Sequence, residues 1–559
     1  MQNSNHLMRS FPSIESLFSC LVLICSSPLI AQQIDPVIGK VVQRELLSKG
    51  LTARDMDDLV RMDRYSSHNG ALVHTFLRQR HNGIEVFNGD IAVHTRPNGE
   101  LIALNNGAVM GIAEKATSKD PSISAQQAIG SVLQREGLAF SSARLEDHDG
   151  ERRRSIFTGI SSTYGPVIVQ LMYLPLNEKV FLVWDVEFQL PDGSHWWKVR
   201  VDATTGVELE RNDLVAQCSF DHGSESDRQC SPVVPFVPAA PNDYNVYARP
   251  LESPNHGPRS LQNAPWNAAF NASPYGWHDT NGVPGAEYTI TRGNNVYAQE
   301  DQNGNNGTGY SPNGTATLDF DHPIDLTQPP NSYTDAAVTN LFYWNNILHD
   351  VLYQYGFDEQ SGNFQSNNYG NGGLGNDHVL ADAQDGSGSN NANFGTPPDG
   401  SNPRMQMFLW TGTPQIDGDL DNGIIAHEYG HGVSNRLVGG PSNTSCLTNA
   451  EQMGEGWSDL LGIIATMEPG DMGPDARGFG TFAKGQAITG PGLRPAPYST
   501  SLSVNSYTYG NTNSGLIVPH GIGFVWCTML WDMTWDLIGQ YGFDPDIYNG
   551  SGGNNIALR

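Results

Sequence analysis

Two histidines and a glutamate stand at a spacing that suits a metal ion and a base. The segment Gly423–Gly432 contains His427, Glu428 and His431 in the order His-Glu-x-x-His. On a helix, residues four apart lie one turn apart on the same face, so both imidazoles can meet one ion. The intervening glutamate is of the type that takes a proton from water. The motif predicts zinc-assisted hydrolysis if a third ligand exists.

A second acidic segment offers that third ligand. Glu455 follows the histidine motif and opens the apolar run 460–465. A helix here would place Glu455 and Asp459 on one face. We expect Glu455 to complete a set of two histidines and one glutamate, which leaves the fourth zinc position for water. We expect Asp459 to accept the remaining N–H of a zinc ligand, that of His427. Glu451 is the alternative ligand, but it precedes the apolar run.

Length, charge and the N-terminus limit the class of protein. The 559 residues exceed one ordinary domain, so a precursor of several parts is expected. With 31 Lys and Arg against 59 Asp and Glu, the formal net charge of −28 argues against a nucleic-acid partner. Residues 1–31 resemble a signal peptide cut near Ala31, with an apolar core too short to span a bilayer. The mature protein is expected to be secreted and not embedded in a membrane.

Four cysteines remain after this leader: Cys218, Cys230, Cys446 and Cys527. An even number of cysteines in an oxidising compartment favours disulfides. We expect Cys218 to pair with Cys230, its near neighbour, and Cys446 to pair with Cys527. Two free buried thiols are the alternative for the second pair.

Hydrophobic periodicity predicts two small α+β units before a connector. Four prolines between Pro232 and Pro241 favour an accessible, semi-stiff linker. Asn98-Gly99 between alternating segments predicts a hairpin. The predicted elements are a helix within 34–60, strands at 71–76, 83–87, 91–95 and 101–104, a helix at 124–136, and strands at 180–186 and 196–201.

Beyond the connector the chain is rich in Gly, Asn, Asp and aromatic residues, with a helix expected at 333–355. The segment Asp417–Gly423 imitates part of a calcium loop, but Asn422 stands where glycine is needed. Aspartates that cap a helix are the better interpretation. Calcium elsewhere in these loops is left open.

These motifs resemble the fungalysins, a family of secreted metallopeptidases whose catalytic core is related to thermolysin. The resemblance is carried by His427–Gly432, Gly454–Asp459, Asn390–Gly400, and, in the propeptide, Val73–Phe87 and His195–Gly206. It implies an α+β fold with two small α+β propeptide domains and a thermolysin-like catalytic domain. That domain would have a β-rich N-terminal lobe and a mainly helical C-terminal lobe, which continues beyond residue 559 in family members.

The resemblance also implies boundaries and partners. The substrates would be proteins and peptides, and the propeptide would act as intramolecular inhibitor and chaperone. The expected divisions are a signal peptide at 1–31, a fungalysin/thermolysin-type propeptide domain at 32–110, a second propeptide module at 111–215, a linker and activation region at 216–242, and the catalytic domain at 243–559.

Family resemblance further assigns the catalytic roles. Glu428 would take the proton from a water that zinc activates, and His520 would contact the tetrahedral intermediate. Asn391 and Ala392 would hold the substrate backbone by strand addition. Thermolysins carry a tyrosine between the second histidine and the third ligand, and this chain has none there. Either His520 alone contacts the intermediate, or a tyrosine such as Tyr507 or Tyr509 takes the place of the missing tyrosine.

Two other functions fit the same ligands. A zinc hydrolase of non-peptide amides would use the same site, and a catalytically silent zinc-binding or adhesion module would use only the metal. Retention of Glu428 argues against the silent module, because a structural zinc has four protein ligands and no need of a base.

Overall fold

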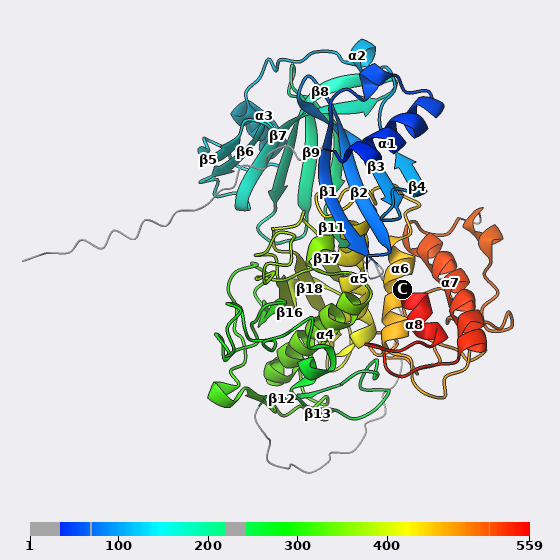
Figure 1. Ribbon diagram of the computed structural model, residues 1–559. Helices are drawn as coiled ribbons and strands as arrows, with labels where there is room; N and C mark the ends of the chain where they lie inside the picture. The colour runs from blue at the N-terminus through cyan, green and yellow to red at the C-terminus, as the bar shows by residue number, and fades with distance from the viewer. Residues whose placement is uncertain (1–33, 68–69, 218–241, 514) are drawn as a thin grey trace, which may run out of the picture.

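The computed structural model describes residues 34–67, 70–217, 242–513 and 515–559 (Figure 1). The expected signal peptide, the Cys218–Cys230 pair and nearly all of the proline-rich linker lie outside the described residues.

The N-terminal part is built on a ten-stranded sheet to which both predicted propeptide units contribute. It lies above the C-terminal part in the view of Figure 1. Val86 of β3 pairs with Tyr173 of β7, which joins the strands of the two units. The strands are β1 Leu59–Ser67, β2 Leu72–His81, β3 Ile84–Thr95, β4 Leu101–Asn106, β5 Arg144–Asp149, β6 Arg154–Thr158, β7 Tyr164–Leu176, β8 Lys179–Gln189, β9 Trp196–Asp202 and β10 Glu208–Asp213.

Two helices cover parts of this sheet, as the periodicity predicts. Helix α1 (Pro36–Ser48) starts at Asp35, whose side chain accepts a hydrogen bond from Val37 N. Its buried face, one residue per turn, packs on β2 and β3 through Ile38, Val42 and Leu46. Helix α3 (Ala125–Arg135) packs its buried face on β7, β8 and β9. The short helix α2 spans Ile112–Lys115. The predicted Asn98-Gly99 hairpin is confirmed, with Thr95 opposite Leu101.

The C-terminal part contains a six-stranded sheet in the order β11-β17-β18-β16-β14, with β19 on β18, and a smaller sheet in the order β13-β12-β15. Strand β11 comes from the end of the N-terminal part and crosses over to this sheet. The strands are β11 Val215–Gln217, β12 Asp243–Val246, β13 Ser260–Asn263, β14 Val296–Glu300, β15 Asp319–Phe320, β16 Val379–Ser389, β17 Ala392–Gly395, β18 Arg404–Trp410 and β19 Ile416–Asp417.

The sequence predicts a helix at 333–355, one at the histidine motif and one after Glu455, and the C-terminal part contains all three. Helix α4 (Thr334–Gln354) contacts β14, β16 and α5, and is buried over most of its length. Polar side chains of this helix therefore form hydrogen bonds inside the core, as where Asn340 Nδ2 donates to Asn422 Oδ1 at the start of α5. The remaining helices are α5 Asn422–Val438, α6 Gly454–Ala465, α7 His520–Tyr541 and α8 Gly553–Leu558.

The expected disulfide between Cys446 and Cys527 is wrong, because both thiols are free. Cys446 lies in the segment between α5 and α6, near Asn443. Cys527 is buried on α7. The order of residues in the sequence does not show whether two cysteine side chains lie close enough to form a disulfide.

Candidate metal centre and active site

Helix α5 brings His427 and His431 together one turn apart. Their Nε2 atoms lie 3.0 Å apart, and both side chains are buried. The helix is buried along most of its length, so the imidazoles are held between α5 and its neighbours. The predicted helical spacing of the motif is therefore the spacing observed.

Close helix packing brings a third donor to the histidines. A Cβ on Gly430 would lie 2.9 Å from the Cα of Ser458, so glycine lets α6 approach α5 at the motif itself. A Cβ on Gly456 would lie 2.4 Å from the carbonyl oxygen of Gly523, so α7 approaches α6 in the same way. Such distances exclude any side chain at these two glycines without movement of the backbone. The three helices converge around the residue beside Gly456, which is Glu455.

The carboxylate of Glu455 faces both imidazoles. Its Oε2 lies 3.4 Å from His427 Nε2, and its Oε1 lies 3.5 Å from His431 Nε2. One ligand atom from each of the three residues lies within 4.8 Å of the others. Two imidazole nitrogens and one carboxylate oxygen fit zinc with a position left for water. The alternative ligand Glu451 is exposed and does not join this cluster.

Asp459 lies behind His427. Its Oδ1 is 2.8 Å from His427 Nδ1, which leaves Nε2 of that ring toward Glu455. A carboxylate that accepts the Nδ1 hydrogen fixes the tautomer and orientation of a ligand histidine.

Two residues that sequence analysis missed hold Asp459. Arg494 donates from Nε to Oδ2 and from Nη2 to Oδ1, both at 2.6 Å, and the Tyr498 hydroxyl also donates to Oδ2. All three side chains are buried. Arg494 and Tyr498 lie in a loop whose sequence shows no periodicity. The one signal for Arg494 was that a buried carboxylate such as Asp459 requires a cation.

The ionisation of the cluster follows from burial and from these partners. Burial by itself would raise the pKa of Asp459, but the Arg494 guanidinium and the His427 ring hold that pKa well below its usual range. Burial lowers the pKa of His431 to about 3. Burial would also lower the pKa of His427, but bonding to Asp459 and Glu455 raises it to about 9. In Glu455 the pKa falls to about 2, because the neighbouring imidazoles outweigh the effect of burial.

The Arg494 contact leads to a testable expectation. Arg494→Lys keeps the positive charge but loses the two parallel hydrogen bonds, so Asp459 would hold His427 less firmly. Changes behind a metal ligand typically cost 10- to 100-fold in metal affinity, and we expect about that loss for zinc in a competition titration. Tyr498→Phe, which removes one hydrogen bond only, should lose less. Equal zinc affinity in Arg494→Lys and the unaltered protein would contradict this role.

The structure places the remaining predicted catalytic residues around the same cluster. Glu428 follows His427 directly on α5, and its side chain is fully buried. His520 begins α7, and its Nε2 lies 3.5 Å from Glu455 Oε1. Burial lowers the pKa of His520, which favours the neutral ring. His520 therefore borders the metal ligands from a third helix.

The tyrosines considered as substitutes differ in position. Tyr509 is 73% exposed. Tyr507 packs edge-on against Phe524. Tyr498, which was not considered, bonds to Asp459. Of His520, Tyr507 and Tyr509, the structure places His520 against a metal ligand, Glu455.

A cleft of about 360 Å³ opens beside the metal ligands, between the two parts of the chain. Its walls include His431, Glu455 and Pro519 from the C-terminal part, and the segment 211–216 from the end of the N-terminal part. Strand β11 in this segment pairs antiparallel with β17, with Ala216 opposite Phe394. Residues 215–217 thus occupy the edge of the six-stranded sheet beside the candidate active site.

The two predicted substrate-binding residues lie at the start of that edge. Asn391 precedes β17, and its Oδ1 is buried without a hydrogen-bond partner among the described residues. Ala392 is the first residue of β17, pairs with Met407 of β18, and is fully buried. Neither residue lines the cleft beside His431. Residues 393–395 are the ones that pair directly with β11.

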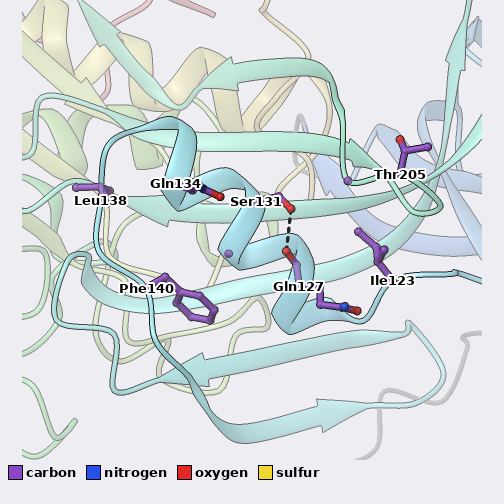
Figure 2. Close-up of a pocket in the computed structure, with 9 residues that line it drawn as sticks. Ile123, Gln127, Ser131, Gln134, Leu138, Phe140 and Thr205 are labelled. Atoms are coloured by element: carbon purple, nitrogen blue, oxygen red, sulfur yellow. Dashed lines mark hydrogen bonds between the residues drawn. The ribbon is translucent and has the colours of Figure 1, made fainter.

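A larger hollow of about 650 Å³ lies elsewhere, on the second propeptide unit. Figure 2 shows Gln127, Ser131 and Gln134 along α3, with Leu138 near Gln134 and Thr205 on the opposite side. No metal-ligating or strongly nucleophilic group lines this hollow. Its lining therefore offers no catalytic chemistry.

The one cluster of three aspartates among the described residues does not support a calcium site. Asp301, Asp382 and Asp385 lie close together and are buried. However, Arg404 pairs with Asp382, and Gln406 Nε2 donates to Asp385 at 2.7 Å. These carboxylates are thus already supplied with a cation and with donors.

The capping interpretation of the segment 417–423 holds in part. Asp417 accepts a hydrogen bond from Asp419 N at 3.0 Å and so caps the short helix Gly418–Leu420. Asp421 precedes α5 without a capping bond from its side chain, which instead accepts from Ala483 N at 3.2 Å.

Among the described residues, no helix is both long and apolar enough to cross a membrane. Comparison with known proteins gives two family matches. Residues 243–559 match the fungalysin metallopeptidase family (M36), and residues 57–108 match the fungalysin/thermolysin propeptide motif.

Named fungal relatives match over most of the chain. "Extracellular metalloproteinase mep" of Aspergillus fumigatus is 38% identical over 493 residues, which cover 86% of this chain and 72% of that protein. "Extracellular metalloproteinase 2" of Trichophyton rubrum is 36% identical over 513 residues, covering 89% of this chain and 76% of that protein. With its histidines and glutamate converging beside a propeptide, the chain belongs to the fungalysin metallopeptidase family.

Proposed function

We propose that this fungalysin is a secreted endopeptidase made as a zymogen, whose zinc is held by His427, His431 and Glu455. The convergence of these three buried donors carries the proposal. The relatives are extracellular metalloproteinases by name, and the family is one of zinc-dependent peptidases, so extracellular proteins are the substrates we infer.

The residues around the cluster suit peptide hydrolysis. When bound, zinc acidifies a water molecule and polarises the carbonyl of the scissile peptide. Glu428 accepts the proton of the attacking water and passes it to the leaving amine. His520 donates a hydrogen bond to the carbonyl oxygen as that oxygen gains charge. Asp459, held by Arg494, keeps the His427 ring in the orientation in which Nε2 is the free donor atom.

Substrates would bind as an added strand on β17. The antiparallel pairing of β11 with this edge supports the proposal, because the propeptide already uses the backbone donors and acceptors that a substrate would need. Asn391, whose buried Oδ1 is available at the start of this edge, would hold the substrate backbone together with the main chain of Ala392. The propeptide would then inhibit by occupying the substrate position.

The division of the precursor is part of the same proposal. We infer a signal peptide at 1–31, propeptide domains at 32–110 and 111–215, an activation region at 216–242, and a catalytic domain at 243–559. Within that domain, the sheet containing β14, β16 and β18 would belong to the N-terminal lobe, and α6 and α7 to the C-terminal lobe.

Removal of the metal tests this function. The processed protein is expected to cleave casein, and a zinc chelator should reduce the rate by more than about 100-fold, because the catalytic water depends on the ion. Readdition of zinc should restore cleavage. A hydrolase of non-peptide amides would leave casein intact, and chelator-resistant cleavage of casein would contradict a zinc mechanism.

A further inference from the structure

The segment between the two ligand-bearing helices forms one wall of the cleft. It follows α5, which carries His431, and precedes α6, which starts beside Glu455; we call residues 439–453 the cleft loop. The same cleft is lined by these residues of the loop: Thr444, Ser445, Leu447, Thr448, Asn449, Ala450 and Gln452.

The other side of the cleft loop is held by the first propeptide unit. Asp63 of β1 accepts from Ser442 Oγ at 2.9 Å and from Ser442 N at 3.3 Å. Asp90 of β3 accepts from Asn443 Nδ2 at 2.6 Å. Phe76 of β2 packs against Gly440 so closely that a Cβ there would lie 2.9 Å from the ring. Figure 1 shows β1 and β2 extending toward α5 and α6.

These contacts come from one face of the propeptide sheet. Asp63 stands opposite Phe76, and Arg78 stands opposite Asp90, so all four side chains lie on one face. Arg78 is buried and donates from Nε to Asp90 at 2.7 Å, while its Nη1 lies 3.1 Å from Glu85. Helix α1 covers the opposite face. The Asp90 carboxylate is therefore held by Arg78 independently of the cleft loop.

We propose that the first propeptide unit exerts a second inhibitory contact, in which Asp63, Asp90 and Phe76 clamp the cleft loop and restrict the opening of the cleft. This contact is separate from β11, which pairs with β17 and lines the cleft. It rests on the proposed function, because it regulates the same site. When the propeptide leaves, Ser442 and Asn443 lose their carboxylate partners and the cleft loop becomes free to move away from the metal ligands.

A double-mutant cycle in the full-length zymogen tests the clamp. Asp63→Ala removes the acceptor from the propeptide, Ser442→Ala removes the hydroxyl donor from the cleft loop, and the third variant carries both. Asp57→Asn, an exposed aspartate of the same propeptide unit, is the matched control. Hydrogen exchange in residues 439–453 and cleavage of a short peptide before processing are the readouts.

We expect hydrogen exchange in the cleft loop to quicken roughly tenfold in Asp63→Ala, less in Ser442→Ala, and no further in the double variant than in Asp63→Ala. Peptide cleavage by the unprocessed zymogen should rise in the same order, and Asp57→Asn should match the unaltered zymogen. If Asp63→Ala does not fold, Ser442→Ala and its exchange still decide the result.

Unchanged exchange in residues 439–453 for both single variants would overturn the clamp, and so would faster exchange without a rise in zymogen activity. The processed unaltered enzyme separates the two proposals. If it does not cleave the peptide, the proposed function fails, while the exchange measurements still report whether the clamp exists.

Discussion

Glu428→Gln is expected to lower kcat for peptide hydrolysis by about 10³- to 10⁴-fold while the protein keeps its zinc. Glutamine has nearly the same size as glutamate, so the buried position of this side chain beside His427 should be preserved. The amide cannot take the proton of the attacking water, and it therefore removes the step that we assign to Glu428. Steady-state kinetics on a short peptide, with zinc content measured in the same samples, gives the answer.

A glutamate outside the cluster provides the control for this substitution. Glu451 is exposed and lies only four residues before Glu455, and Glu451→Gln should leave kcat within about twofold, as is usual for surface changes. If kcat of Glu428→Gln stays within tenfold of that of the unaltered enzyme, Glu428 is not the base.

Glu455→Gln is expected to weaken zinc binding by more than about 100-fold, since even partners behind a ligand cost 10- to 100-fold. The neutral amide oxygen is a poorer zinc donor than a carboxylate. It also no longer balances the two imidazoles that now lie within 3.5 Å of it. Zinc retained after dialysis against a weak chelator, followed with activity, measures the effect.

Excess zinc distinguishes this substitution from the loss of the base. Activity of Glu455→Gln should partly return in excess zinc, because His427 and His431 still offer two donors. Activity of Glu428→Gln should stay low at any zinc concentration. A Glu455→Gln enzyme that binds zinc as tightly as the unaltered protein would show that another group is the third ligand.

The helices of the site were predictable because their signals are local. The spacing of His427 and His431 places both on one face of any α-helix, and the apolar run after Glu455 indicated α6. Helix α4 and the Asn98-Gly99 hairpin were predictable for the same reason. Each depends on residues a few positions apart, where helix and turn geometry decide the outcome.

The remaining features depend on contacts between distant residues. Arg494 meets Asp459 across 35 positions from a loop without a pattern, and Val215 pairs with Gly395 across a still longer separation. The wrong pairing of Cys446 with Cys527 has the same origin. An even number of cysteines in an oxidising compartment indicates that disulfides can form, but it does not indicate which side chains lie close enough to bond. Such contacts follow from packing, which single-sequence periodicity does not specify.

The most direct test of the account is a crystal structure of the processed enzyme, with anomalous diffraction recorded on both sides of the zinc absorption edge. We predict one zinc peak at about 2.0–2.2 Å from Nε2 of His427, Nε2 of His431 and a carboxylate oxygen of Glu455, with the remaining position open to water. A zinc ion coordinated without Glu455, or bound away from the two imidazoles, would contradict the central claim.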